Sequence, residues 1–344
     1  MSTLQVINAK HPSSASNNLV LDASGNAAFA GNVTSAGMVV PSSSFLRNRI
    51  INGDYRIDQR NNGASGTALG YNLDRWIYGS NLTGRFTWQR NQGSVTPPPG
   101  FTNYIGFTTT SSLPVLGASD YFHFGQPIEG FNVSDLAFGT ANAAPVTVSF
   151  WVRSSLTGTF GAVLRNGASS YAYPFQYTIS AANTWEREVI TIPGAVAGTW
   201  ATDNGAGMSL LFGLGVGTSL SAPANAWIAQ DVASASGVSV VGTLGATLFV
   251  TGVQLEVGSV ATPFERRQYG QELALCQRYF LAATYFVNSA SVGRNCAMFP
   301  AAMRIAPTIT GGGSGYASSV VTTVGFCNDQ TAGAQQNLTF NAEF

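Results

Sequence analysis

The sequence is poor in charged residues. Only 9% of its 344 residues are Asp, Glu, Lys or Arg, against roughly 25% in ordinary soluble domains. Sixteen basic residues balance sixteen acidic ones, so the chain has no net charge to attract nucleic acid or an anionic membrane. We therefore expect no nucleic-acid partner. A surface with so little charge must instead be covered by hydroxyl, amide and glycine groups or by other subunits.

Long apolar runs are absent as well. No stretch approaches the ~20 apolar residues of a membrane-spanning helix, and the first ten residues lack the basic segment and apolar core of a secretory signal. The sequence therefore predicts no membrane insertion. We expect a protein that is made in a cytoplasm and stays soluble.

Cysteine and histidine are scarce. Cys276, Cys296 and Cys327 make an odd number without CxxC spacing, which argues against a disulfide framework and against a zinc site. We expect buried free thiols, the usual state of unpaired cysteine. The two histidines, His11 and His123, are too few for a histidine-rich metal site or a Ser/His/Asp triad. We expect no cofactor, and His123, between Phe122 and Phe124, should face solvent or an interface.

What the sequence has is alternation of apolar and polar residues, typical of β-strands with one buried face. The clearest strands are expected at 145–154, 185–193, 208–216 and 246–257. In the last of these, Phe249, Thr251, Val253 and Leu255 should share one face. Strands of this length separated by Gly, Asn and Pro turns predict a mainly β chain, with an antiparallel β-sandwich over residues 45–260.

The stretch 261–280 contains the most convincing helix. Residues 271–278 are almost all good helix formers, and Leu273, Cys276 and Tyr279 fall on one face. Two turns are too short to be stable without packing on other parts of the chain. We therefore interpret 261–280 as a linker with one short helix. Its charged residues are expected to form a joint between domains or subunits: Glu265, Arg266, Arg267, Glu272 and Arg278.

Two smaller regions flank the sandwich and this linker. Residues 1–44 are expected to form an arm with a hairpin around 22–26, which must dock on other subunits or on a larger particle because a two-stranded unit is marginal alone. The alternative for this region is a partly disordered leader. Residues 281–344 should form a small β domain with strands at 285–292, 296–303, 308–309, 320–326 and 338–344. The last strand is expected to run to the final residue.

Four passages, in this order along the chain, resemble tail-fibre and related appendage proteins of tailed bacteriophages. They are NNLVLDASGNAAFAGNVTSAG, NRIINGDYRIDQRN with LDRW, ATPFERRQYGQELALCQRYF after VQLEVGSV, and MRIAPTIT with NLTFNAEF. The resemblance implies a homotrimer whose arm binds other virion proteins. Three strand-like passages, VTVSFWVRSS, NTWEREVITIP and VTGVQLEVGS, also resemble the jelly rolls of carbohydrate-binding modules, which implies a jelly-roll-like sandwich.

Sugar binding is the interaction that the residues favour. Aromatic rings stack on sugar rings while nearby amides and carboxylates bond the hydroxyls. Six residues fit this pattern and are candidate glycan-binding residues: Trp88, Tyr171, Tyr173, Trp200, Asp203 and Asn204. Core packing is the alternative for each ring, and Trp227 fits either role. We expect core positions for Trp76, Phe150 and Phe212.

Catalysis and metal binding have weaker support. Hydrolysis of a glycoside uses two carboxylates, whereas the acidic residues, Asp231 among them, are scattered singly over different segments. We therefore expect no enzyme activity and no catalytic residues. Asn52 and Asp54 offer oxygen ligands for a rim calcium, but a turn in which Asp58 pairs with Arg60 is favoured over a metal site.

The sequence therefore predicts a phage virion protein, assembled in the host cytoplasm. The favoured function is that of a tail fibre or receptor-binding protein that attaches to host cell-surface glycans. The alternatives are a capsid decoration or head fibre with a structural role, and a polysaccharide depolymerase.

Overall fold

The computed structural model describes residues 47–286, 293–311, 318–330 and 335–344, and before them the backbone of five short strands. The chain forms two compact units, Met1–Arg47 and Asn48–Phe344. In the first unit, strands β1 (Asn8–Ala9), β2 (Leu19–Leu21) and β3 (Ala27–Phe29) form one sheet, and β4 (Val33–Ser35) pairs with β5 (Met38–Val40). The antiparallel pairing of β2 with β3 confirms the predicted hairpin. The remainder of the predicted arm, with His11, lies outside the described residues.

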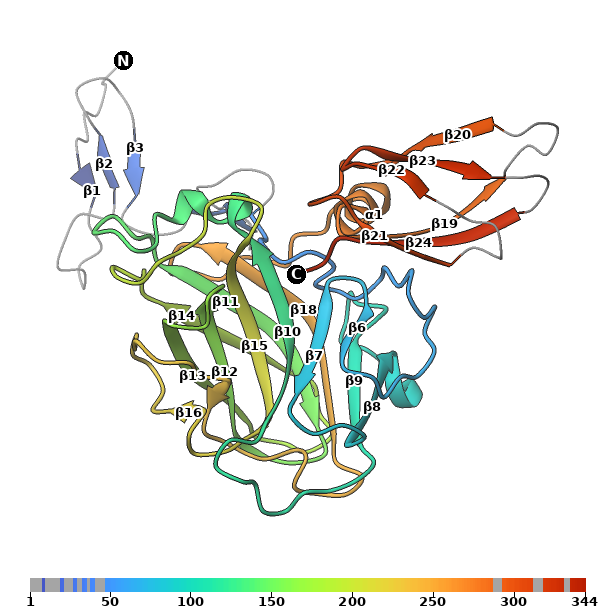
Figure 1. Ribbon diagram of the computed structural model, residues 1–344. Helices are drawn as coiled ribbons and strands as arrows, with labels where there is room; N and C mark the ends of the chain where they lie inside the picture. Colours follow the sequence, from blue (N-terminus) through green and yellow to red (C-terminus); the bar gives the residue numbers. More distant parts are fainter. Residues whose placement is uncertain are drawn as a thin grey trace. The chain divides into compact units, whose positions relative to one another are not determined.

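The second unit contains a sandwich of two antiparallel sheets (Figure 1). The six-stranded sheet has the order β13-β12-β15-β10-β7-β6, from β6 (Gly70–Leu73), β7 (Trp76–Ser80), β10 (Tyr121–Glu129), β12 (Gly158–Asn166), β13 (Ala172–Ile179) and β15 (Ala206–Val216). The five-stranded sheet has the order β14-β11-β18-β9-β8, from β8 (Phe86–Arg90), β9 (Ile105–Thr109), β11 (Val146–Ser154), β14 (Glu186–Ile192) and β18 (Thr247–Val257). The fold is thus mainly β and sandwich-like, as predicted.

Short elements complete the sandwich. The 3-10 turns η1 (Gln92–Ser94), η2 (Gly130–Asn132) and η3 (Ser134–Leu136) lie between strands, and β16 (Ser221–Ala222) pairs in parallel with β17 (Ser234–Ala235). The segment 217–235, which carries both of these strands, is named the covering loop here. Its residues Ala222 and Val232 pack with Val163 and Leu211 of the six-stranded sheet, outside the main core.

Apolar side chains fill the space between the two sheets. The alternating residues of 146–152 and 208–214 enter this core, and the expected core positions of Trp76, Phe150 and Phe212 are confirmed because all three are fully buried. Strand β18 departs from its prediction. Leu248 and Val250, rather than Phe249 and Thr251, join Val253 and Leu255 in the core.

A β-bulge explains this error. The pairing of β18 with β11 shifts register opposite Ser149 and Trp151, and Gly252 has a φ of +63°. One extra residue reverses the face of every side chain before it. A simple alternating pattern therefore assigned the first half of β18 to the wrong side of the sheet.

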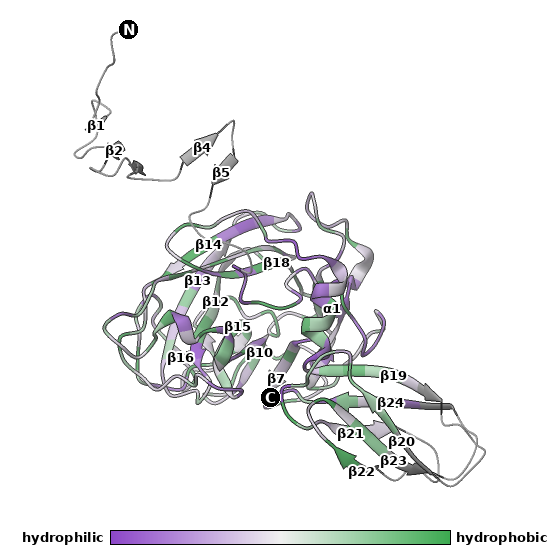
Figure 2. Ribbon diagram, turned by 90° about the horizontal axis from the view of Figure 1, so that it is seen from above, coloured by the Kyte–Doolittle hydropathy of each residue, from purple (hydrophilic) through white to green (hydrophobic). Residues whose placement is uncertain are grey.

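Helix α1 (Tyr269–Gln277) lies within the predicted linker. Cys276 and Tyr279 are buried against Ile51 and Ile57, with Leu273 partly buried beside them. Figure 2 shows both hydrophobic and hydrophilic residues on this helix, in keeping with one buried side. The helix is therefore stabilised by packing on the segment that opens the second unit.

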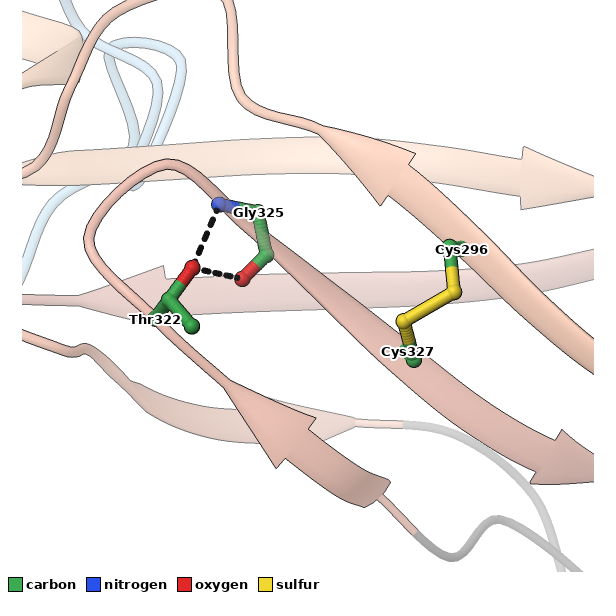
Figure 3. The surroundings of a disulfide bond; sticks show 4 residues. All are labelled: Cys296, Thr322, Gly325 and Cys327. Carbon is green, nitrogen blue, oxygen red and sulfur yellow. Dashed lines mark hydrogen bonds between the residues drawn. A yellow bond between two sulfur atoms is a disulfide. The ribbon is translucent and has the colours of Figure 1, made fainter.

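The C-terminal part forms two three-stranded sheets with a small apolar core. One sheet has the order β19-β24-β21, from β19 (Phe280–Phe286), β21 (Thr308–Gly311) and β24 (Gln335–Asn341), and the other has the order β20-β23-β22, from β20 (Gly293–Met298), β22 (Ser318–Val321) and β23 (Gly325–Gln330). The first two strands begin earlier than predicted. The predicted strand at 320–326 is two strands, because residues 322–324 form a turn in which the Thr322 side chain bonds Gly325 (Figure 3).

Two of the cysteines are paired, contrary to the prediction of free thiols. Cys296 of β20 and Cys327 of β23 are directly opposite each other and form a disulfide (Figure 3). Spacing alone did not reveal it, because the two residues are 31 positions apart and meet only through strand pairing. Cys276 is a buried free thiol, as expected.

The last three residues form a clasp rather than the predicted strand end. The Ala342 amide donates to the Tyr279 carbonyl at 2.8 Å, and the Glu343 carboxylate pairs with Arg75 and, at 3.1 Å, with Arg60. Arg304 lies over the Phe344 ring.

Arg60 thus pairs with Glu343, and the predicted Asp58–Arg60 pair is wrong. Asp58 instead accepts the amides of Asn61 and Gly63, as expected for an Asx turn.

The described residues contain neither a cluster of metal-binding side chains nor a membrane-spanning helix. No group of three or more His, Cys, Asp or Glu side chains gathers there. Asp54 pairs with Arg56 at 3.2 Å, and the Asn52 side chain bonds the backbone of Ile57 and Asp74. No helix in this part of the chain is long and apolar enough to cross a membrane.

Candidate functional site

A pocket of about 330 Å³ lies on the outer face of the six-stranded sheet, and we name it the sheet pocket. Its volume is at the lower end of the range of small-ligand sites, ~300–1,000 Å³. The sheet contributes one set of lining residues, Ile77 and Gly79 of β7, Tyr121 and His123 of β10, and Arg165 of β12. The covering loop contributes a second set, Leu220, Asp231 and Ala233.

Strand alternation places these sheet residues outside the core. Phe122 and Phe124 point into the sandwich, so His123 between them points to the outer face, and Arg165 does the same beside Leu164. In register, His123 is opposite Gly213 of β15, and Arg165 is opposite Ser209 of the same strand. The two side chains therefore belong to different strands and enter the pocket from different positions along the sheet.

The His123 imidazole is held between Tyr121 and Gly79. Its ring is stacked on Tyr121, with centroids 5.3 Å apart and planes at 19°. A Cβ on Gly79 would lie 2.5 Å from Nε2 of His123, so only glycine leaves room for the ring in this position. His123 was expected to face solvent or an interface, but only 8% of it is exposed.

Arg165 and Asp231 form the charged part of the pocket. Arg165 Nη1 donates to Asp231 Oδ1 at 2.8 Å and to the Val232 carbonyl at 3.2 Å. The Arg165 side chain is 17% exposed and that of Asp231 57%. The pair therefore attaches the covering loop to the sheet and presents the carboxylate at the open side.

Burial sets the protonation of these groups. Burial, assisted by the Arg165 charge, lowers the pKa of His123 to about 3, so the imidazole is neutral at physiological pH. Burial also lowers the pKa of Arg165, opposed by the charge of Asp231. Arg165 Nε and His123 Nδ1 are both buried and have no hydrogen-bond partner among the described residues.

A second feature is an aromatic cluster at the loops beside β13. Trp227 lies at its centre, with ring centroids 5.7 Å from Tyr171, 5.2 Å from Tyr173 and 5.6 Å from Trp200. Phe138 packs on both tryptophans. The two indole N–H groups donate to the carbonyls of Ala197 and Pro193. The cluster thus offers partly exposed ring surface, but its N–H groups already have partners.

Comparison with known proteins gives only a distant likeness. No family model matches the chain, and no curated protein matches its sequence. The sandwich resembles solved carbohydrate-binding modules. A family 61 module, solved with β-1,4-galactotriose, is 9% identical with a TM-score of 0.32 and matches 62% of this chain and 99% of its own. A family 11 module of a Clostridium thermocellum cellulase is 9% identical with a TM-score of 0.30 and matches 58% of this chain and 99% of its own.

One phage protein is similar at the same level. It is the enzymatically active domain of tailspike protein 4 of bacteriophage CBA120, 14% identical with a TM-score of 0.34. The match covers 61% of this chain but only 21% of the tailspike chain.

The structure brings together only part of the predicted glycan-binding set. Tyr171, Tyr173 and Trp200 meet in the aromatic cluster. Trp88 is fully buried, stacked on Phe107 with centroids 5.4 Å apart, so its ring is not open to a sugar. Asp203 Oδ1 accepts the Gly205 amide, and Asn204 bonds Arg304 near the C-terminal clasp.

The predicted joint residues all contact other parts of the second unit. Four of them reach distant segments through hydrogen bonds or ion pairs: Glu265 Oε2 accepts the Asn48 amide, Arg267 Nη1 donates to the Ile50 carbonyl, Glu272 Oε1 accepts the Asn52 amide, and Arg278 pairs with Glu129. Arg266 lies over the rings of Phe101 and Phe264. A role between subunits stays a prediction.

Sequence reasoning missed the sheet pocket. Tyr121 and Arg165 were not among the candidates, and Asp231 was noted only as an isolated acid. One signal was available, because a histidine and an arginine interrupt apolar strands at outward positions while Gly79 and Gly213 leave space on neighbouring strands. The contribution of the covering loop had no comparable signal.

Proposed function

We propose that this chain is an attachment protein of a tailed-bacteriophage virion, a tail fibre or receptor-binding protein, and that it binds a host-surface glycan in the sheet pocket. The observation that carries the binding part is the pocket itself. Tyr121 and Leu220 offer apolar surface, while Arg165, Asp231 and His123 offer donors and acceptors. A sugar has the same two features, C–H faces and hydroxyl groups.

The virion part of the proposal is supported by the sequence. The four passages that resemble phage appendage proteins are spread between residues 17 and 344, and the low charge content suits a tightly assembled particle. In this proposal the chain is a homotrimer located in the virion, and residues 1–44 bind other virion proteins.

We propose attachment rather than hydrolysis. The residues that line the sheet pocket include one carboxylate, Asp231, whereas glycoside hydrolysis generally uses a pair. Because its pKa is lowered to about 3, His123 is a weak base at physiological pH, which favours hydrogen bonding to hydroxyl groups over proton transfer.

A glycan array tests the proposal. The purified chain should bind a subset of bacterial surface glycans without shortening them. Arg165→Ala should reduce binding at least about tenfold, since it removes charge-assisted hydrogen bonds worth ~1.5–3 kcal/mol. Arg187→Ala is the matched control, because Arg187 lies on β14 of the opposite sheet, and it should bind as the unmodified chain does.

A chain that binds no glycan at all contradicts attachment and leaves the structural role as a capsid decoration or head fibre. Shortened products would indicate a depolymerase.

A further inference from the structure

The sheet pocket has no net charge in its lining. Arg165 and Asp231 are joined at 2.8 Å, so their opposite charges offset each other. Among the described residues that line the pocket, no other acid or base is charged at neutral pH, because His123 is neutral there. A ligand in the pocket therefore meets a balanced ion pair and not a free cation.

The two charges are not equally accessible. The Arg165 side chain is 17% exposed and its Nη1 is already bonded to the covering loop, whereas the Asp231 side chain is 57% exposed. A ligand that enters from solvent thus meets the carboxylate more readily than the guanidinium. A carboxylate on the ligand would be repelled by Asp231, while a hydroxyl group would donate to it.

We infer that the sheet pocket selects uncharged sugars and that Asp231 is the residue that rejects acidic ones. The inference rests on the proposed glycan binding and names its substrate class. Arg165 and His123 bond the hydroxyl groups, Tyr121 contacts the C–H surface of the ring, and Asp231 both accepts from a hydroxyl and repels a uronic acid.

The test compares neutral hexoses with the matching uronic acids, which differ only in replacing a CH₂OH group by a carboxylate. Immobilised glycans that end in glucose or galactose are paired with those that end in glucuronic or galacturonic acid. The unmodified chain should bind the neutral member of a pair at least about tenfold more tightly. Asp231→Asn, which keeps the shape of the side chain, should reduce this ratio about tenfold, and Asp231→Ala should reduce it similarly.

Asp135→Asn is the matched control. Asp135 is also paired with an arginine, Arg49, at 2.6 Å and is 55% exposed, but it lies in η3, away from the pocket lining. This variant should keep the ratio of the unmodified chain. The inference is overturned if the unmodified chain prefers the acidic member, or if both Asp231 variants keep the original ratio. If the unmodified chain binds neither the neutral nor the acidic glycans, the proposed function is overturned, and this inference with it.

Discussion

At the scale of single residues, the sheet pocket depends on a few polar side chains that point outward from apolar strands. His123 is the clearest example. It lies between two core phenylalanines and points outward, yet its ring is stacked on Tyr121 and is almost fully buried. The pattern of the sequence predicted its direction but not its burial. Burial depends on the neighbouring strands and the covering loop, which alternation along one strand does not describe.

The neutral state of His123 should make folding sensitive to acid. Its pKa is lowered to about 3 in the folded chain, whereas an unfolded histidine has a pKa of about 6.5. As the pH falls below about 6.5, the unfolded chain binds a proton that the folded chain does not, so the free energy of unfolding falls by up to ~1.4 kcal/mol per pH unit. Urea denaturation between pH 7 and pH 4 should show this loss in the unmodified chain and a smaller loss in His123→Gln. Equal pH dependence of the two chains would contradict the burial of a neutral imidazole.

Glu343 should matter more for stability than its place next to the C-terminus suggests. Its carboxylate pairs with Arg75, a side chain only 1% exposed. Glu343→Gln leaves that cation buried without a counter-charge, which should cost ~3 kcal/mol of unfolding free energy. Asp135→Asn, which breaks an exposed pair, should cost ~1 kcal/mol or less. Chemical denaturation measures both losses, and similar small values would show that the clasp contributes little.

At the scale of secondary structure, the strands with clear alternation were predicted and the irregular segments were not. The positions of β11, β14 and β15 follow from apolar residues at every second position. The face of the first half of β18 was wrong because one bulge residue is invisible to a period of two. The covering loop was missed because residues 217–235 have no periodicity and are held by contacts such as Arg165–Asp231.

The bulge in β18 should depend on Gly252. Its φ of +63° disfavours other residues, and a Cβ there would lie 2.6 Å from the Phe101 ring. Gly252→Ala should therefore destabilise the chain by ~1–3 kcal/mol. Gly245→Ala is the control, because Gly245 has a similar φ of +76° but open space around it, and it should cost ~1 kcal/mol. Thermal or chemical unfolding of the two variants gives the comparison, and equal losses would mean that Phe101 moves aside freely.

At the scale of the whole molecule, fold class was predictable from the sequence and the site was not. Period-two patterns, turn residues and the expected short helix were enough for a sandwich followed by small C-terminal sheets. The site required knowledge of which distant residues meet: Trp88, a sugar-binding candidate by its neighbours, is in the core, while Tyr121 and Asp231 meet in one pocket although they are far apart in the chain. Only Tyr171, Tyr173 and Trp200 of the predicted set come together.

Assembly is the main whole-molecule prediction. Under the proposed function the chain should be a homotrimer, with a mass in light scattering of three times the 36.0 kDa of one chain. Removal of residues 1–44 should abolish binding to other virion proteins in a pull-down from phage particles, while glycan binding by the second unit persists. A monomer at micromolar concentration would contradict the trimer.

The most direct test of the central claim is a crystal structure of the chain soaked with the best neutral sugar from the array. The account predicts a sugar ring in the sheet pocket, in contact with Tyr121 and hydrogen-bonded to Arg165 and Asp231. A sugar bound only at the aromatic cluster of Tyr171, Trp200 and Trp227 would contradict it. So would a sheet pocket without bound sugar at a saturating sugar concentration.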